Sequence, residues 1–241
     1  METGQSITEL GCSAYNEATH HNETSFTHPY LHMVALCQRI NDILPKTPPV
    51  RLEAETELLL SREGESYIAS VVSGSISLDV RIAGGGKWRN LALVSSPLIV
   101  GQNQIMHWSD NKLMRISGYN GGAQVRLYPV SVVEALLTEY QEWETMSRLL
   151  ALSDSYTLYM HGLTLSGNAY CIVRGMLEHM KSDDFCMFRQ VNATVFISQR
   201  TGLSRSSVAN ILSRLHHGNF IHIESGKVES IGQLPETLNE K

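Results

Sequence analysis

The side chains best suited to specific chemistry lie in the segment ISQRTGLSRSSVANILSRLHHGNFI, from residue 197 to residue 221. On a helix that begins after Ser204, one face carries short polar groups and one long donor: Arg205, Ser206, Asn210 and Ser213. Arginine can donate two hydrogen bonds to guanine O6 and N7, and asparagine can bind adenine N6 and N7 in the same way. This face therefore predicts the reading of base edges in the major groove of DNA.

The charge around this segment also suits DNA. Residues 185–223 contain no Asp or Glu and four arginines: Arg189, Arg200, Arg205 and Arg214. The formal net charge of the whole chain is −5, but residues 165–241 hold 8 basic and 7 acidic residues. An acid-free surface favours phosphate contacts. A solvated helix face is the plain alternative, and the negative whole chain leaves open a helix-turn-helix that serves as a protein-interaction module without specific DNA binding.

An enzyme would need a nucleophile or an acid/base pair whose geometry the sequence fixes. Cys186 with His179 or His161 is the nominal candidate, and no motif sets the distance between these groups. The Gly run at residues 84–86 lacks the Lys-Ser/Thr pair of a phosphate loop and fits a hairpin turn. We therefore expect no enzymatic activity.

Metal and redox chemistry find little support in the sequence. The N-terminal region holds four histidines without an accompanying cysteine or carboxylate pattern: His20, His21, His28 and His32. We therefore expect no metal and no cofactor. The four cysteines are far apart and include no C-x-x-C pair. We interpret Cys171 and Cys186 as small buried hydrophobes in a reducing cytoplasm, with redox sensing as the alternative.

A helix-turn-helix would position the base-reading face. Such a motif needs a small residue in its first helix, a glycine in the turn and an apolar inner face on its second helix. Ser198 and Gly202 fill the first two roles, and Ser204 is a suitable N-cap for the second helix. The inner face is then Leu203, Val208, Ile211, Leu212 and Leu215. FIHIESGKVESI follows and predicts a two-stranded wing, with Lys227 at a phosphate, although a plain surface hairpin would have the same sequence.

The first part of the chain has a different texture. Residues 1–28 are polar and predict a flexible leader, and residues 30–43 predict a helix that ends before a proline-rich stretch. From residue 50 to residue 128, short β-rich runs alternate with glycine and polar turns. This spacing is typical of an antiparallel jelly roll.

Helices are predicted from residue 129 to residue 164. One apolar seam recurs at steps of three and four residues: Leu149, Leu152, Tyr156, Tyr159 and Leu163. A second apolar face contains Trp143, Met146 and Leu150. Two apolar faces favour two packing partners, which we take to be the roll and a second copy of the chain. The contact with the second copy is predicted for Leu149, Leu152, Tyr156 and Tyr159. Purely internal packing remains the alternative.

This order of modules, with the core GLSRSSVANILSRLHHGNFI, resembles the cyclic AMP receptor/FNR (Crp/Fnr) superfamily of bacterial transcription regulators over about residues 50–231. Within it, the chain is similar to the enterobacterial branch that restrains resistance to hydrogen peroxide. The resemblance implies a homodimer on double-stranded DNA at a palindromic promoter site, with RNA polymerase as a further partner. It also implies that Arg205, Ser206 and Asn210 match the usual base-reading positions. The full DNA-contacting set that we predict is Thr194, Ser204, Arg205, Ser206, Asn210, Ser213 and Lys227.

The effector site departs from that family. Members that bind cyclic nucleotides carry a Gly-Glu pair, whose Glu holds the ribose, and an Arg about ten residues later for the phosphate. Here Gly101 matches, Gln102 replaces the acid, and Leu113 and Met114 stand where Arg and a small polar residue belong. Arg115 lies two positions away and could substitute. The four clustered cysteines of an oxygen sensor are absent from the sequence. We expect a degenerate cyclic-nucleotide site.

The sequence thus predicts an α+β protein, with a cyclic-nucleotide-binding-like β-roll, a long dimerisation helix and a winged helix-turn-helix. The expected domains are 1–28, 29–128, 129–164 and 165–241. With 42% hydrophobic and 18% charged residues, the composition is that of a globular chain. No apolar run approaches the roughly 20 residues that a membrane helix needs, so we expect a cytoplasmic protein without membrane contact.

Overall fold

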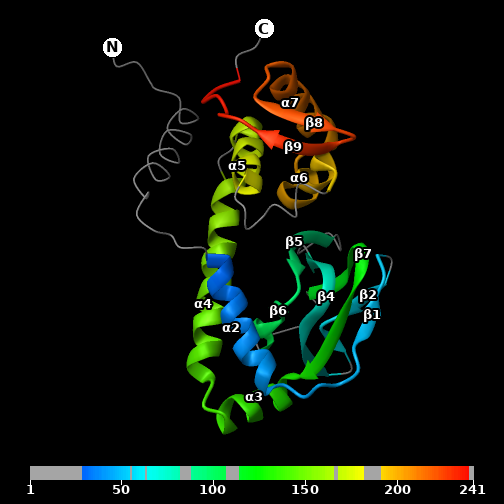
Figure 1. Cartoon of the computed structure of the whole chain (residues 1–241), viewed down its shortest axis with the longest axis vertical. Coiled ribbons are helices and arrows are strands. Elements are labelled where there is room, and N and C mark those ends of the chain that lie inside the picture. Colours follow the sequence, from blue (N-terminus) through cyan, green and yellow to red (C-terminus); the bar gives the residue numbers. More distant parts are fainter. Residues whose placement is uncertain are drawn as a thin grey trace. The chain divides into compact units, whose positions relative to one another are not determined.

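The computed structural model describes residues 29–54, 56–62, 64–81, 88–106, 114–165, 168–181 and 191–238. It divides into two compact units, and the division falls between Ser155 and Tyr156, inside helix α4 (Trp143–Thr164). An antiparallel sheet, helices and a C-terminal winged helix-turn-helix follow one another along the chain (Figure 1), which confirms the predicted α+β class. Among the helices of the described ranges, none is long and apolar enough to cross a membrane.

The N-terminal unit is built on two long antiparallel strands, β4 (Glu65–Arg81) and β7 (Met114–Pro129). The remaining strands pair antiparallel with one of these two: β1 (Val50–Leu52), β2 (Glu57–Leu59), β3 (Ser61–Arg62), β5 (Trp88–Ser95) and β6 (Ile99–Val100). Buried and less buried positions alternate along much of β7, because neighbouring side chains of a strand point to opposite faces. The buried set forms the core of a β-roll.

Glycine allows the two long strands to pass close to each other. Gly74 has φ +75°, and a Cβ at this position would lie 2.2 Å from the carbonyl oxygen of Gly122. A contact between carbon and oxygen at that distance is not possible, so a side chain would push β4 away from β7. The pairing register shifts at the same place, between Gly74 and Ser75.

Three helices complete this unit: α2 (Pro29–Ile43), α3 (Val130–Glu139) and the first part of α4. In Figure 1, α2 and α4 run beside the roll, and Ile40, Met146 and Leu149 are fully buried in its core. The Arg39 guanidinium lies 2.7 Å from the Glu142 carboxylate, which ties α2 to the residue before α4. A hydrogen bond from Thr145 and the nearby Arg39 lower the pKa of Glu142.

The C-terminal unit contains the end of α4 and the DNA-binding motif. Its other elements are α5 (Ala169–Lys181), α6 (Ala193–Thr201), α7 (Arg205–His217), β8 (Ile221–Glu224) and β9 (Lys227–Ile231). Four of the five residues predicted for the inner face of the second helix are buried: Val208, Ile211, Leu212 and Leu215. The fifth, Leu203, is half-buried in the turn before α7.

The close passage of the strands gives a first prediction. Replacing Gly74 with Ala should lower the free energy of unfolding of the N-terminal unit by about 2 kcal/mol or more, because strain at a positive φ adds to the collision with Gly122. Gly64→Ala is the matched control, since Gly64 also has a positive φ (+81°) but no atom within 4 Å of the added Cβ. Urea unfolding of both variants measures the difference. Equal destabilisation by the two substitutions would show that the collision contributes nothing.

Candidate nucleic-acid interface

The turn between α6 and α7 has the geometry that the sequence predicts. Gly202 ends α6 in the left-handed region, with φ +77°, and its N–H donates to the Ser198 carbonyl at 2.9 Å. The Ser198 hydroxyl donates to the Leu203 carbonyl at 2.8 Å, so the small residue of the first helix binds the turn directly. A left-handed C-cap is a common use of glycine, because glycine has no Cβ to clash.

Helix α7 begins with the predicted cap. The Ser204 side chain accepts a hydrogen bond of 3.1 Å from the Ser207 N–H, which satisfies one of the free donors at the helix start. Its hydroxyl also lies 2.9 Å from that of Ser206 and 2.8 Å from that of Ser207. Ser204 therefore has a structural role, as the N-cap of α7, in addition to any contact with DNA.

The outer face of α7 is open to solvent. Four of the predicted DNA-contacting side chains on it are exposed: Arg205, Ser206, Asn210 and Ser213. The sequence of α7 contains no acidic residue. Thr194, on α6, is half-buried. The structure thus brings one arginine, one asparagine and two serines together on one exposed helical face.

The wing is bound to the start of α6. Ser225 and Gly226 form the turn between β8 and β9 at positive φ, and the Gly226 carbonyl accepts a hydrogen bond of 2.9 Å from the Ala193 N–H. Lys227 follows the turn as the first residue of β9 and is half-buried. Asn192, which the sequence reasoning missed, caps α6 by accepting from the Val195 N–H at 3.1 Å. Its residue type was the available signal, since Asn is a preferred N-cap.

A second contact joins the wing to the end of α7. The Ile223 N–H donates to Nδ1 of His216 at 3.3 Å, and the His216 and His222 rings lie 5.6 Å apart. Groups of three or more His, Cys, Asp or Glu residues able to hold a metal do not occur within the described ranges.

The acid-free stretch is not a row of four surface arginines. Arg205 is exposed and Arg214 half-buried, whereas Arg200 is only 7% exposed. The prediction that Arg200 belongs to a phosphate-facing surface is therefore wrong. Inside the unit, its Nη2 donates to the Tyr156 hydroxyl at 3.0 Å. Arg189 lies outside the described residues.

The predicted dimer seam on α4 is mostly covered by the protein's own packing. Leu149 is fully buried in the core of the roll, so it has no surface for a partner chain. Leu152 and Tyr156 are half-buried, and Tyr159 is 40% exposed. The rings of Tyr156 and Tyr159 lie 5.8 and 5.9 Å from that of His179 on α5. Sequence periodicity identified a real helix face but could not say what covers it.

The cysteines also differ from expectation. Cys171 is disulfide-bonded, so its interpretation as a free buried hydrophobe is wrong. Cys186 and the first three histidines of the N-terminal group lie outside the described residues. Cys37, on α2, is a free thiol, and burial raises its pKa to about 11. A thiol with so high a pKa carries little thiolate, which is the reactive form.

The turn at which the sequence predicts a degenerate effector site is hydrogen-bonded to α4. After Gly101 the chain forms a short 3₁₀ helix, η1 (Gln102–Met106), and Gln102 Nε2 donates to the Ser153 hydroxyl at 2.7 Å. Within the described part of the chain, the buried amide oxygens of Gln102 and Gln104 have no hydrogen-bond partner. Met114 is buried and Leu113 lies outside the described residues.

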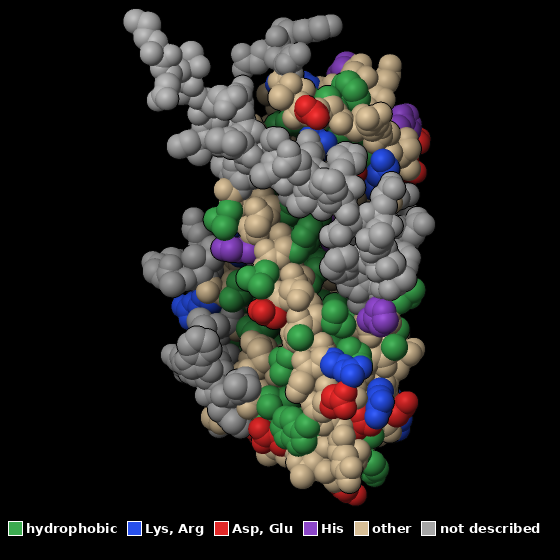
Figure 2. Space-filling view, turned by 90° about the vertical axis from the view of Figure 1, so that its left-hand side faces the viewer, with side chains coloured by type: hydrophobic (Ala, Val, Ile, Leu, Met, Phe, Trp, Pro, Cys, Tyr) green, Lys and Arg blue, Asp and Glu red, His purple; other side chains and the backbone are tan. Residues whose placement is uncertain are grey.

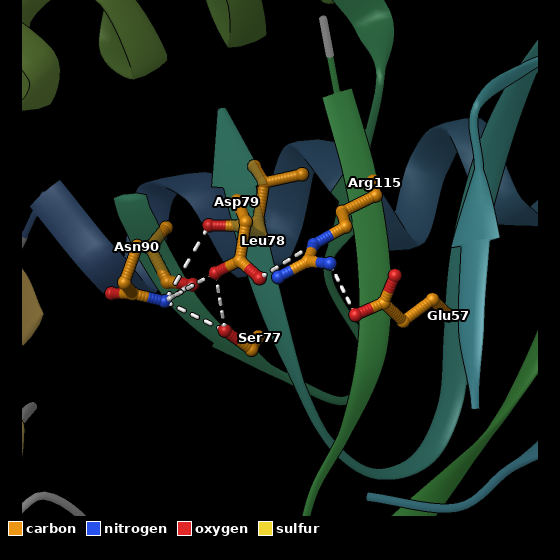
Figure 3. A network of polar contacts seen from close by, with 7 residues as sticks. Glu57, Ser77, Leu78, Asp79, Asn90 and Arg115 are labelled. Carbon is orange, nitrogen blue, oxygen red and sulfur yellow. Dashed lines mark hydrogen bonds and ion pairs between the residues drawn. The ribbon is translucent and has the colours of Figure 1, made fainter. Parts of the chain in front are cut away.

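Arg115 is engaged by other side chains of the roll (Figure 3). Its Nε lies 3.2 Å from Asp79, its Nη1 is ion-paired with Glu57, and its guanidinium is 4.5 Å from the centre of the Trp88 ring. Ser77 donates to Asp79 at 2.8 Å and so helps to hold the carboxylate in place. Strands β2, β4, β5 and β7 each supply a member of this network.

Comparison with known proteins agrees with this geometry. Residues 169–236 match the family model described as winged helix-turn-helix DNA binding. The Xanthomonas campestris regulator CLP, described as responsive to c-di-GMP, superposes with a TM-score of 0.63 at 12% identity, over 83% of this chain and 99% of that one. FixK2 from Bradyrhizobium japonicum superposes with a TM-score of 0.58 at 17% identity, over 77% of this chain and 91% of that one.

The chain has the Crp/Fnr fold. A CRP family transcriptional regulator from Thermus thermophilus gives a further TM-score of 0.53 at 16% identity, over 74% of this chain and 90% of that one. The Crp/Fnr fold accounts for the order of roll, long helix and winged helix-turn-helix. CLP and the Thermus thermophilus protein are both described as regulators.

Two sequence relatives that share a name match parts of the chain. Salmonella typhimurium has a protein named inhibitor of hydrogen peroxide resistance that is 37% identical over 71 residues, which is 30% of this chain and 34% of that protein. The protein of the same name from Escherichia coli K12 is 30% identical over 108 residues, 44% of this chain and 52% of that protein. The matches thus span about a third and about half of these relatives.

Burial of His179 gives a prediction for the C-terminal unit. Burial and then the charge of Arg200 lower the pKa of His179 to about 4. An unfolded chain takes up this proton near pH 6.5, so the unfolded state binds more protons as pH falls from about 6.5 to 4. At about 1.4 kcal/mol per pH unit, this single group should remove about 3 kcal/mol of unfolding free energy over that range.

The measurement is urea unfolding between pH 4 and pH 7. His179→Gln should lose this component of the pH dependence, whereas substitution of the exposed His161 by Gln should keep it. A pH dependence unchanged by His179→Gln would contradict the assignment.

Proposed function

We propose that the protein is a sequence-specific DNA-binding transcription regulator that acts as a homodimer. The observation that carries this proposal is the exposed, acid-free face of α7, which begins with Arg205 on a winged helix-turn-helix. Such a face can enter the major groove with its arginine near the helix start and its asparagine one turn and a half further on. RNA polymerase is the further partner that a regulator at a promoter implies.

The names of the sequence relatives support a role in the response to hydrogen peroxide. On this proposal, the target promoters belong to genes whose expression changes with peroxide. We do not assign peroxide sensing to Cys37, because its side chain is fully buried and burial raises the pKa of its thiol.

The dimer contact is proposed for the outward stripe of α4 rather than for the predicted seam. The stripe consists of Ala151, Ser155, Leu158 and Gly162 on α4 and of Leu165 directly after the helix, at steps of four and three, and all five are exposed. Leu158 is 63% and Leu165 is 68% exposed, and a Cβ added to Gly162 would meet no atom within 4 Å. Figure 2 faces the side on which α4 lies in Figure 1, and apolar side chains reach the surface there beside uncharged groups. This spacing suits a short parallel coiled coil between two copies.

The roll is proposed not to respond to cyclic nucleotides. A cyclic phosphate needs a cation to offset its loss of hydration, and Arg115 already lies between two carboxylates. The η1 turn offers the buried oxygens of Gln102 and Gln104, which would repel a phosphate and suit a neutral hydrogen-bond donor.

The contribution of Arg205 is the direct test of DNA reading. Arg205→Ala should weaken binding to the operator by about 1 to 3 kcal/mol and leave binding to scrambled DNA little changed, because a base contact is lost. Lys227→Ala is the matched comparison and should weaken both DNAs by a similar factor, because a phosphate contact carries no sequence information. Titration of both variants on both DNAs gives the ratios. If Arg205→Ala left the ratio of operator to scrambled affinity unchanged, α7 would not read bases.

The oligomeric state of variants tests whether the outward stripe forms the dimer contact. Leu158→Glu together with Leu165→Glu should place unpaired charges in the contact between two copies and give a monomer by sedimentation. Ser131→Glu, at an exposed position of α3, adds one glutamate per chain outside α4 and should leave the dimer intact. A dimer of undiminished strength in the double variant would place the interface elsewhere.

Isothermal titration with cyclic AMP and cyclic GMP at millimolar concentration tests the roll. We expect no saturable binding, and we expect Arg115→Ala to lower the stability of the roll, because Asp79 and Glu57 lose their shared cation. Saturable micromolar binding that Arg115→Ala abolishes would restore the ordinary effector mechanism.

A further inference from the structure

A buried polar contact joins the end of α4 to the first helix of the DNA-binding motif. The Tyr156 hydroxyl accepts a hydrogen bond from Arg200 Nη2 at 3.0 Å and lies 3.4 Å from Nε2 of His179. These three residues come from α4, α6 and α5. All three belong to the C-terminal unit.

This contact lies in a buried place, where a guanidinium loses its contacts with water. Arg200 and His179 are each 7% exposed. A buried guanidinium must have its donors satisfied, and its attraction to an aromatic face is stronger away from water. Tyr156 supplies both kinds of contact, because the Arg200 Cζ also lies 5.9 Å from the centre of its ring. Removing the hydroxyl would therefore weaken the hold on Arg200 while leaving the ring in place.

The position of Arg200 connects this contact to DNA reading. It lies in the last turn of α6, two residues before Gly202 and four before Ser204, the N-cap of α7. The next residue, Thr201, is buried, and its hydroxyl donates to the Ile197 carbonyl at 2.7 Å and accepts from the Leu203 N–H at 3.3 Å. If Arg200 moved, this short, hydrogen-bonded turn would therefore move with it, and so would the start of α7, which contains Arg205.

We propose that Tyr156 is a positioning residue for operator recognition, whose hydroxyl holds Arg200 and thereby fixes the direction in which α6 and α7 leave α4. This inference rests on the proposed function, because it assigns a role in DNA reading. Leu158, two residues further along α4, belongs to the outward stripe proposed for the dimer contact. Two recognition helices must match half-sites about 34 Å apart, so a small change in the attachment of each α7 to α4 misplaces both on the operator.

The variant that isolates the hydroxyl is Tyr156→Phe, in the full-length chain. It should lower affinity for the operator about tenfold and affinity for scrambled DNA by much less, with the salt dependence of operator binding little changed. Tyr159→Phe is the matched control, since its ring also lies against His179, while the 3.0 Å hydrogen bond from Arg200 Nη2 goes to the hydroxyl of Tyr156. It should bind the operator as the wild type does. Urea unfolding under the binding conditions verifies that each protein is folded.

A double-variant cycle distinguishes positioning from general loosening. If Tyr156 acts through Arg200, then Arg200→Gln should reduce operator affinity as well, and the double variant should be little worse than the weaker single variant. Independent, additive losses would overturn the proposal.

The remaining outcomes also decide the matter. Wild-type protein that binds operator and scrambled DNA equally would refute the proposed function itself. Specific binding by the wild type with undiminished operator affinity in Tyr156→Phe would overturn the positioning role alone, even if that variant were less stable. Equal losses in Tyr156→Phe and Tyr159→Phe, or equal losses on operator and scrambled DNA, would assign the effect to packing around His179 and would also overturn it.

Discussion

Helix α4 contributes buried side chains to both compact units of the chain. Met146 and Leu149 belong to the core of the roll, and Met160 and Leu163 are buried further along the same helix. Near that end the fit is tight, since a Cβ added to Gly175 of α5 would lie 2.7 Å from Leu163. The stripe that ends at Leu158, Gly162 and Leu165 is exposed, and we propose it as the contact with a second copy. This constraint underlies the proposals for assembly and for the role of Tyr156.

The winged helix-turn-helix was the part that the sequence predicted best, because short-range rules determine its turn and its caps. Gly202, Ser204 and the buried face of α7 obey rules that act over a few residues: a left-handed cap, a side-chain N-cap and helical periodicity. The sequence could not show which part of the structure packs against each helix face. Periodicity placed Leu149 and Tyr159 on one seam, but only the fold shows that the first is buried and the second is 40% exposed. Arg200 looked like a surface cation until its bond to Tyr156 was seen.

The state of Arg115 depended on strand register and could not be read from sequence. Its carboxylate partners lie 36 and 58 residues away along the chain, and the antiparallel pairing of β4 and β2 with β7 brings them to it. Arg115 is thus paired with two carboxylates of the chain itself. Figure 3 shows this network within the roll.

The central claim is that the exposed face of α7 directs the protein to particular DNA sequences. It is tested most directly by recovering the DNA bound by the full-length protein across the genome, with and without hydrogen peroxide, and aligning the recovered sites. We expect a shared palindrome whose half-sites lie about one helical turn apart, as two copies of a recognition helix require. Recovered DNA with no common sequence would contradict it and would favour a helix-turn-helix that serves protein interaction instead.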